Sequence, residues 1–373
     1  MREIYLDNAA TTAVIPEALA AAQNTMTECY GNPGSVHAKG RQASLLLSRC
    51  RKTVAAAAGC EEGCITFTSG GSESINTALR GAAFKNKHLG RHIITTQIEH
   101  DATLNTLRQL EQEGYEVSYV APQRDGSVTL ESLTSAMRED TILMSLMGVC
   151  NETGAILPVN AAAKALKERN PKALVHMDAV QLFCKREMSL QDIDLCSVSA
   201  HKIGALKGSG ALYIRKGLKL RPLIYGGNQE SGMRSGTEAM PQIAAFAAAA
   251  EKRAGVLRDT IAHFDALKKQ MLDTLRGMGV HFELNSPENS SSHVVNISLC
   301  KLRSEVLIRM LSDKGIFVSG GSACAKGKKS HVLSAMRLSP KNIDAALRIS
   351  FCPENTSEDV AYFCDKIAEI AKS

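Results

Sequence analysis

The sequence predicts an α/β protein, in which a mostly parallel sheet is sandwiched by helices and is followed by a smaller α+β domain. From residue 64 to residue 214, short strand-like runs alternate with helical patterns, as in parallel sheets that are covered on both faces. After residue 239 this alternation stops, and an alanine-rich helical stretch precedes a second group of strands. The length of 373 residues fits one large domain or two unequal ones.

The first group of strands is rich in β-branched and other apolar residues. Its members are CITFTS (64–69), HIITT (92–96), EVSYVA (116–121), TILMSLMG (141–148), LVHMDA (174–179), LCSVSA (195–200) and GALYI (210–214). Apolar residues at helical spacing lie between them, over 72–88, 101–113 and 159–169. Such sheets bind ligands in the loops after the carboxyl ends of their strands, so those loops are the expected place for a site.

The second group of strands lies in the C-terminal part of the chain. Its members are VHFEL (280–284), VVNISL (294–299), IFVSG (316–320) and ALRISF (346–351), with helical patterns near 303–314 and 357–372. A helical stretch spanning roughly 240–277 connects the two groups, and we place the domain boundary near residue 255. Because the N-terminal segment is expected to pack with the smaller unit, the predicted domains are 16–255 and, together, 1–15 with 256–373.

Composition and charge exclude several classes of protein. The net charge of +6 is mild, and aromatic residues make up only 4% with no Trp, so direct nucleic-acid binding is not expected. The first residues, MREIYLDNAATT, are too charged for a secretory signal, and no apolar run is long enough to cross a membrane. The cysteines are scattered, and Cys60 and Cys64 lack a matching second pair, so no metal site is expected. We therefore expect a reduced, cytoplasmic protein.

Lys202 is the first candidate for chemistry. It follows a strand-like run in SVSAHKIGALKGSG (197–210) and lies beside Ser199 and His201, at a strand end. A lysine that is desolvated there can form a Schiff base with a carbonyl compound, whereas an ordinary surface lysine in a loop is the alternative. Enzymes that use pyridoxal phosphate need such a lysine, an acid for the pyridinium nitrogen and a cradle for the phosphate.

Two other motifs would supply the cradle and the acid. TSGGSES (68–74) follows a strand and opens a helix, so its backbone N–H groups would hold a phosphate, although Ser72 would equally serve as a plain helix cap. HMDAVQ (176–181) ends another strand with Asp178 on an apolar background. That aspartate is either a helix cap or a buried charge that is kept for a partner such as a pyridinium.

Cys324 lies in an unusual setting for a cysteine. The stretch VSGGSACAKGKKSHVL (318–333) surrounds it with glycines, serines and lysines, whereas buried structural cysteines usually lie in apolar runs. Lys326, Lys328 and Lys329 would favour the thiolate, which is the nucleophilic form of the side chain. The alternative is that these lysines are only a solvated run of charge.

In their order along the chain, these motifs resemble those of the cysteine desulfurases, which are pyridoxal phosphate enzymes of the class V aminotransferase group. The resemblance extends over nearly the whole length. It rests on YLDNAATT (5–12), GNPGSVHAKGR (31–41), TSGGSES (68–74), EH (99–100), NETG (151–154), DAVQ (178–181), SAHKIGALKGSG (199–210), RSGTE (234–238), SGGSACAKG (319–327) and LRISF (347–351).

The resemblance implies fold type I, pyridoxal 5′-phosphate as the cofactor, L-cysteine as the substrate and a role for each matching residue. Lys202 would form the Schiff base and move protons, His100 would stack on the pyridine ring, and Cys324 would take up the sulfur. The other cofactor contacts would come from Gly71, Ser72, Asn151, Asp178, Gln181, Ser199 and His201, and from Thr237 of the second subunit of a homodimer.

Within this set, Asp178 would pair with the ring nitrogen, Gln181 would bond the phenolic oxygen, and Asn151 and Arg348 would bind the substrate. Cys352 departs from the family pattern, because it stands where glycine is usual. Packing is the expected role of this thiol.

The implied activity is that of an L-cysteine desulfurase, which makes L-alanine and a persulfide on Cys324 for an acceptor protein. The acceptor would be an iron–sulfur scaffold or a tRNA-thiolating enzyme, and the sequence does not choose between them. A selenocysteine lyase is one alternative, but Cys324 on a loop favours the desulfurase. A non-enzymatic scaffold of a sulfur-transfer complex is the other, and the retention of Lys202 argues against it.

Overall fold

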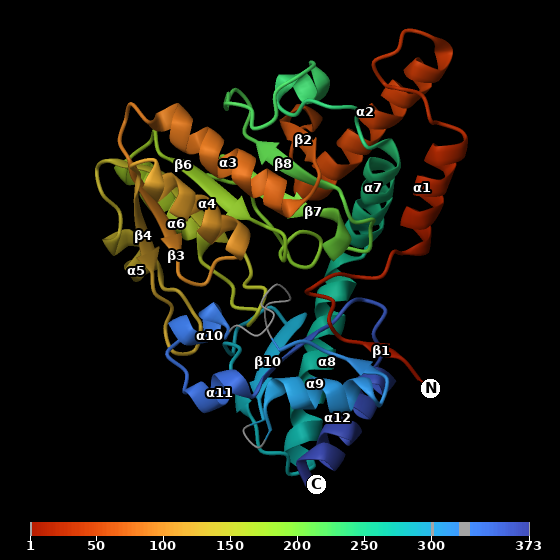
Figure 1. Cartoon of the computed structure of the whole chain (residues 1–373), viewed down its shortest axis with the longest axis vertical. Helices are drawn as coiled ribbons and strands as arrows, with labels where there is room; N and C mark the ends of the chain where they lie inside the picture. The colour runs from red at the N-terminus through yellow and green to blue at the C-terminus, as the bar shows by residue number, and fades with distance from the viewer. Residues whose placement is uncertain (1, 300–301, 321–328, 373) are drawn as a thin grey trace.

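The computed structural model describes residues 2–299, 302–320 and 329–372, and it contains a large sheet with a smaller unit beside it (Figure 1). The large sheet has the strand order β2-β8-β7-β6-β5-β3-β4, and β8 is antiparallel to both of its neighbours. The other pairs are parallel, so the predicted mostly parallel sheet is confirmed. The strands are β2 (Ile65–Thr68), β3 (His92–Thr96), β4 (Glu116–Val120), β5 (Thr141–Met147), β6 (Leu174–Asp178), β7 (Leu195–Ser199) and β8 (Gly210–Ile214).

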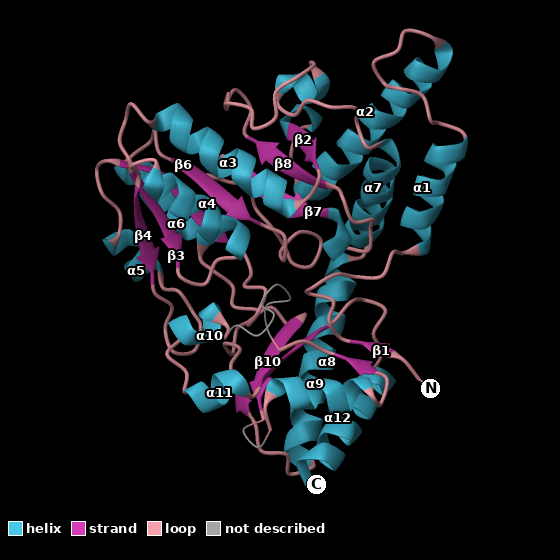
Figure 2. Ribbon diagram, in the orientation of Figure 1, coloured by secondary structure: helices cyan, strands magenta, loops and turns pink. Residues whose placement is uncertain are grey.

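Helices cover both faces of this sheet (Figure 2). One face carries α3 (Gly71–Asn86) and α4 (Asp101–Gln112). The opposite side carries α1 (Pro16–Thr27), α2 (Ala38–Ala58), α5 (Leu130–Ser135), α6 (Val159–Arg169) and α7 (Met240–Gly255). Neighbouring strand residues belong to different cores, since Ile93 packs on the α3 side and Ile94 on the other. Burial on both faces explains why β5 and β6, in the middle of the sheet, are buried along their whole length, whereas the edge strand β4 is not.

The smaller unit is built on antiparallel strands in the order β12-β10-β9, and β1 pairs in parallel with β11 beside them. These strands are β1 (Ile4–Tyr5), β9 (Glu283–Leu284), β10 (Val294–Ser298), β11 (Ile316–Phe317) and β12 (Ala346–Ser350). The helices are α8 (Leu257–Gly277), α9 (Ser304–Ser312), α10 (His331–Ala335), α11 (Pro340–Asp344) and α12 (Ser357–Lys372).

Three predicted elements of this region differ in length from the observed ones. The runs 280–284 and 316–320 contribute only two-residue strands, β9 and β11. The helical stretch 240–277 is divided into α7 and α8 at Val256, whose φ and ψ of −121° and 21° interrupt the helical backbone. The division into two domains near residue 255 stays a prediction.

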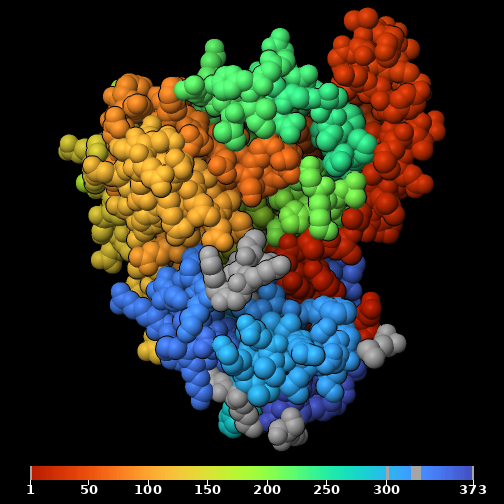
Figure 3. All heavy atoms as spheres, viewed as in Figure 1, coloured from red at the N-terminus to blue at the C-terminus, as the bar shows by residue number. Residues whose placement is uncertain are grey.

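The two units meet where the carboxyl ends of the large-sheet strands face the smaller unit, and Figure 3 shows their atoms directly against each other. The N-terminal segment crosses this junction. Ala9 N donates to Ser350 Oγ at 2.8 Å, and Thr12 N donates to the backbone oxygen of His201 at 3.0 Å. In the described part of the chain, no helix is long and apolar enough to cross a membrane.

Candidate active site

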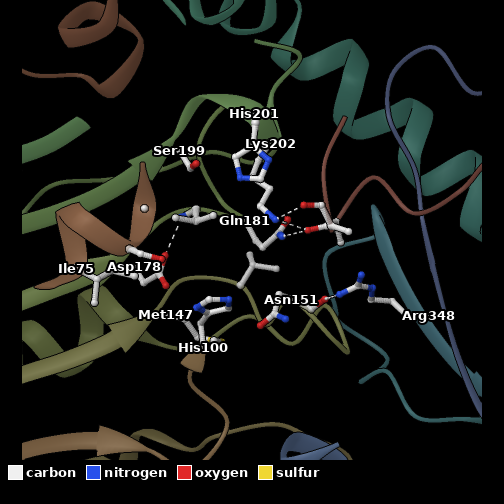
Figure 4. Close-up of a pocket in the computed structure, with 16 residues that line it drawn as sticks. Ile75, His100, Met147, Asn151, Asp178, Gln181, Ser199, His201, Lys202 and Arg348 are labelled. Atoms are coloured by element: carbon white, nitrogen blue, oxygen red, sulfur yellow. Dashed lines mark hydrogen bonds between the residues drawn. The ribbon is translucent and has the colours of Figure 1, made fainter. Parts of the chain in front are cut away.

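A cavity of about 250 Å³ lies at this junction. The predicted site residues that line it come from segments distant in sequence: Gly71, Ser72, His100, Asn151, Asp178, Gln181, Ser199, His201, Lys202 and Arg348. Figure 4 shows Lys202 and His100 on opposite sides of the cavity, with Asp178 toward one end and Arg348 toward the other. Thr237 is exposed and does not line it, and Cys324 lies outside the described residues.

Lys202 is held at the end of a short 3₁₀ turn (Ala200–Lys202) that directly follows β7. Its Nζ donates to the backbone oxygens of Ala9 and Ala10, at 2.7 Å each. The amine is thereby aimed into the cavity by the N-terminal segment, where it is half-buried. This position suits an amine that must reach a carbonyl group bound in the cavity.

Asp178 ends β6 and is 5% exposed. Val180 N donates to its Oδ1 at 2.9 Å, and among the described residues no ion pair with a cationic side chain is found. Burial raises the pKa of Asp178, and the nearby His100 and Lys202 oppose that rise. A buried carboxyl of this kind is stabilised by a cationic N–H group, such as that of a pyridinium ring.

The N-terminus of α3 forms an open cradle for an anion. Gly70 precedes the helix with φ of +152°, and in the described structure no side chain caps the first turn. A Cβ on Gly71 would lie 2.9 Å from Val180 Cγ2, so the backbone approaches closely there. Glu73 is directed elsewhere, because it accepts from Ser69 N at 2.8 Å and from Arg234 Nε at 3.0 Å. The helix N–H groups therefore remain available to a phosphate.

His201 and Ser199 flank the same cradle. Burial, with a smaller contribution from the charge of Lys202, lowers the pKa of His201 to about 4. The ring is therefore neutral at physiological pH, and its Nδ1 lies 3.1 Å from Thr11 Oγ1. A neutral imidazole and a hydroxyl both offer donors to an anionic ligand.

His100 is the N-cap of α4, and its Nδ1 accepts a hydrogen bond from Ala102 N at 3.1 Å. This bond fixes the orientation of the ring and places the proton of the neutral form on Nε2. The residue lies in the connection that follows the carboxyl end of β3.

Arg348 lies in the middle of β12 and is 1% exposed. Its Nη2 donates to Asp7 Oδ1 at 2.7 Å, and its Nη1 donates to the backbone oxygen of Asn151 at 3.0 Å. Nε has no partner in the part of the chain that the structure describes. A buried guanidinium whose Nε has no partner among the described residues is suited to a carboxylate ligand.

Residues 319, 330 and 331, which lie on either side of 321–328, form hydrogen bonds with residues at or next to the cavity. Ser319 exchanges backbone hydrogen bonds with Arg348, at 2.7 and 3.3 Å. Ser330 Oγ donates to Glu152 Oε2 at 2.5 Å, and His331 Nε2 lies 3.0 Å from the backbone oxygen of Glu99. Sequence reasoning missed Glu99 and Glu152, although both belong to motifs quoted above.

These features fit pyridoxal phosphate, since the cavity combines a lysine amine, an unpaired buried acid among the described residues and an open anion cradle. Comparison with known proteins agrees. The model of the family described as aminotransferase class-V matches residues 4–363. The chain therefore belongs to the class-V aminotransferases, which are fold type I enzymes that use pyridoxal phosphate.

The relatives of the chain indicate which reaction of this enzyme class it catalyses. A protein of Methanosarcina thermophila named cysteine desulfurase IscS is 38% identical over 375 residues, which span all of this chain and 92% of that protein. One of Clostridium botulinum with the same name is 37% identical, over all of this chain and 95% of that protein. The chain is accordingly a cysteine desulfurase.

Solved structures lead to the same conclusion. A structure described as a NifS-like protein matches over the full length of both chains, with a TM-score of 0.94 and 39% identity. Another, described as SspA in complex with cysteine, has a TM-score of 0.82 and 32% identity, and it covers 95% of this chain and all of that one.

Proposed function

We propose that the chain takes sulfur from L-cysteine onto Cys324, releases L-alanine and passes the persulfide sulfur to an acceptor protein. The observation that carries this proposal is the convergence of Lys202, Asp178, His100 and Arg348 on one cavity. Each comes from a different strand end or strand, so the convergence is a property of the whole fold.

When it is bound, pyridoxal phosphate withdraws electrons from the Cα–H and Cβ–S bonds of the substrate. Lys202 would hold the cofactor and would move the proton at Cα of the substrate. Asp178 would accept a hydrogen bond from the ring nitrogen, and His100 would stack on the ring. The carboxylate of L-cysteine binds Arg348 and the neighbouring Asn151.

The sulfur step balances without an external oxidant. The Cys324 thiolate attacks the sulfur of bound L-cysteine, so an S–S bond forms while the Cβ–S bond breaks. The electron pair of the broken bond stays on carbon, and protonation of that carbon gives L-alanine. The products are L-alanine and a persulfide on Cys324.

The phosphate is proposed to bind Gly71, Ser72, Ser199 and His201, with Thr237 supplied by a second copy of the chain. Thr237 is exposed and lies off its own cavity, in a loop that also exposes large apolar side chains. Tyr225, at the beginning of that loop, is 65% exposed. A homodimer would bury this surface and complete the cradle.

The test of the dimer mixes two inactive variants, Lys202→Ala and Thr237→Ala. In a dimer with one subunit of each variant, one site contains both substitutions. The other site contains neither, because it takes Lys202 from one subunit and Thr237 from the other. Partial recovery of alanine formation supports a shared site, and no recovery in a mixture shown to exchange subunits contradicts it.

The acceptor is proposed to be an iron–sulfur scaffold or a tRNA-thiolating enzyme, and the protein is placed in the cytoplasm, where thiols stay reduced. The IscS name of the relatives supports the scaffold. Incubation with L-cysteine that carries labelled sulfur, together with each candidate acceptor, tests this part of the proposal. Label on neither acceptor would contradict it.

Cys324→Ser separates binding from chemistry. This variant is expected to bind the cofactor and to change its absorbance on addition of L-cysteine, but to form almost no persulfide. Release of sulfide and alanine at the wild-type rate would overturn the role of Cys324.

A further inference from the structure

Lys185 is a buried lysine that the roles described so far leave unused. Its side chain lies in the turn after β6 and is 7% exposed. Its Nζ donates to Gln181 Oε1 at 2.8 Å, and no carboxylate among the described residues forms an ion pair with it. Burial of an amine away from any acid is costly, so a lysine at this position calls for a physical reason.

The acceptor of that bond belongs to the active site. Gln181 is 3% exposed and lines the cavity, and its Nε2 donates to the backbone oxygen of Ala9 at 2.8 Å. The same Ala9 oxygen accepts from Lys202 Nζ. Figure 4 shows Gln181 beside Lys202, with both side chains directed to this backbone segment.

The two partners of Gln181 determine which way its amide points. The Ala9 oxygen can only accept, and the Lys185 amine donates in either of its protonation states. A reversed amide would place its oxygen against the Ala9 oxygen and its NH₂ group against the Lys185 amine. The observed orientation therefore keeps the NH₂ group on the cavity side and the oxygen on the Lys185 side.

We propose that Lys185 is a positioning residue, which holds the Gln181 amide so that its NH₂ group donates to the phenolic oxygen of the cofactor. The hydrogen bond to Gln181 Oε1 also polarises the amide, and a polarised NH₂ group is a stronger donor. This inference rests on the proposed role of Gln181.

The groups around Lys185 are consistent with a donor that needs no acid. The Lys202 and Arg348 cations and the Cys352 and Cys184 thiols face it. Burial and the charge of Lys202 hold the pKa of Lys185 well below its usual value. His293 Nε2 lies 3.4 Å from the same Gln181 oxygen, a longer contact than that of Lys185.

The test replaces Lys185 with methionine, which matches the length of the lysine stem and removes a desolvated amine. Two quantities are measured without substrate: the Kd for pyridoxal phosphate, and the pH midpoint of the visible absorbance change of the bound cofactor. We expect the Kd to rise about tenfold and the midpoint to rise by about one pH unit, the size of effect given by one hydrogen bond to a charged oxygen.

The direction of the midpoint shift follows from charge. A weaker donor leaves more negative charge on the phenolic oxygen, and that charge holds the proton on the neighbouring Lys202 nitrogen more tightly. Lys185→Leu repeats both measurements with a different apolar side chain. An unchanged midpoint in both variants would overturn the proposal.

Lys268→Met is the matched control. Lys268 is also buried, and its Nζ donates to Ser290 Oγ at 2.8 Å, but Ser290 does not line the cavity as Gln181 does. We expect its Kd and midpoint to equal those of the wild type. A shift as large as that of Lys185→Met would mean that any loss of a buried amine produces the effect.

A double-mutant cycle decides whether Lys185 acts through Gln181. We expect Gln181→Ala alone to shift the midpoint, and Lys185→Met to add nothing in the Gln181→Ala background. Equal effects of Lys185→Met in both backgrounds would refute action through Gln181. If Gln181→Ala itself shifted nothing, the role of Gln181 would fail first, which is a different outcome from a failure of Lys185 alone.

Discussion

Replacement of Ser330 by alanine is expected to destabilise the attachment of the segment after the Cys324 stretch. Ser330 is buried, and its Oγ both donates to Glu152 Oε2 and accepts from Leu333 N at 3.0 Å as the N-cap of α10. Glu152 Oε1 has no hydrogen-bond partner among the described residues. The substitution would therefore remove the cap of α10. It would also remove the one hydrogen-bond donor that the described residues offer to the buried Glu152 carboxyl.

The two losses have separate sizes. Loss of the cap costs about 1 kcal/mol. Leaving a buried acceptor without its donor costs about 1–3 kcal/mol. We therefore expect the free energy of unfolding of Ser330→Ala to fall by about 2–4 kcal/mol in urea titrations. Burial raises the pKa of Glu152 and the Ser330 bond opposes that rise, so the variant should raise this pKa further.

Ser339→Ala provides a control in a helix of equal length. Ser339 caps α11, and within the described ranges its Oγ has hydrogen bonds only with Asn342 of the same helix, from Asn342 N at 3.2 Å and to Asn342 Oδ1 at 2.9 Å. This variant should lose the cap and a hydrogen bond to a neutral amide oxygen, but no bond to a carboxyl, so its loss should be smaller than that of Ser330→Ala. Ser330→Thr keeps the hydroxyl and should recover most of the loss. Equal losses in Ser330→Ala and Ser339→Ala would refute the contribution of Glu152.

Three other outcomes are expected. Burial raises the pKa of Glu99 to about 8, so the folded protein holds a proton that the unfolded chain has released, and stability falls as pH rises through about 4.5 to 8. Glu99→Gln should flatten that slope in urea titrations, and an unchanged slope would contradict it. Lys202→Ala should lose the yellow colour, and borohydride should fix the cofactor to no other lysine. Replacement of Lys326, Lys328 and Lys329 by glutamate should slow persulfide transfer to the acceptor more than it slows alanine formation in the presence of a small thiol. The defect in transfer should become smaller as the salt concentration rises. Parallel losses at every salt concentration would exclude steering.

The large sheet was predictable because its signals are local. Each strand is a short run rich in β-branched and other apolar residues, and Lys202 and Asp178 could be placed at strand ends from the sequence alone. The resemblance then indicated which of these strand ends share a site, and the cavity brings the same residues together.

The long helix α2 was not predicted, because its buried face is narrow. It begins after His37, whose side chain accepts from Gly40 N, and ends at Gly59, whose φ is +72°. Several of its buried positions are alanines, as at Ala43 and Ala55. Because these positions hold small residues among many polar ones, the periodic spacing of apolar residues is weak in the sequence. The helix is recognised from its packing against α7 in the structure.

The hydrogen-bonded polar pairs of the site could not be predicted, because no regular sequence spacing connects the two residues of a pair. Asp7 and Arg348 are 341 residues apart and meet only because β1 and β12 belong to the same unit. Lys185 and Gln181 are four residues apart, but they lie in a turn, where helical spacing rules do not apply.

The N-terminal segment connects the proposed substrate and cofactor ends of the site. Asp7 holds Arg348 through Nη2, while the backbone oxygen of Ala9 accepts from both Lys202 and Gln181. Arg348 is therefore already paired with a carboxylate before a substrate arrives, and this pairing keeps a buried cation in place. The carboxylate of L-cysteine carries the same charge as Asp7, so it can use the remaining Nε or replace Asp7 at Nη2 without leaving the guanidinium unpaired. Either way, the first residues of the chain would form part of the proposed substrate-binding site.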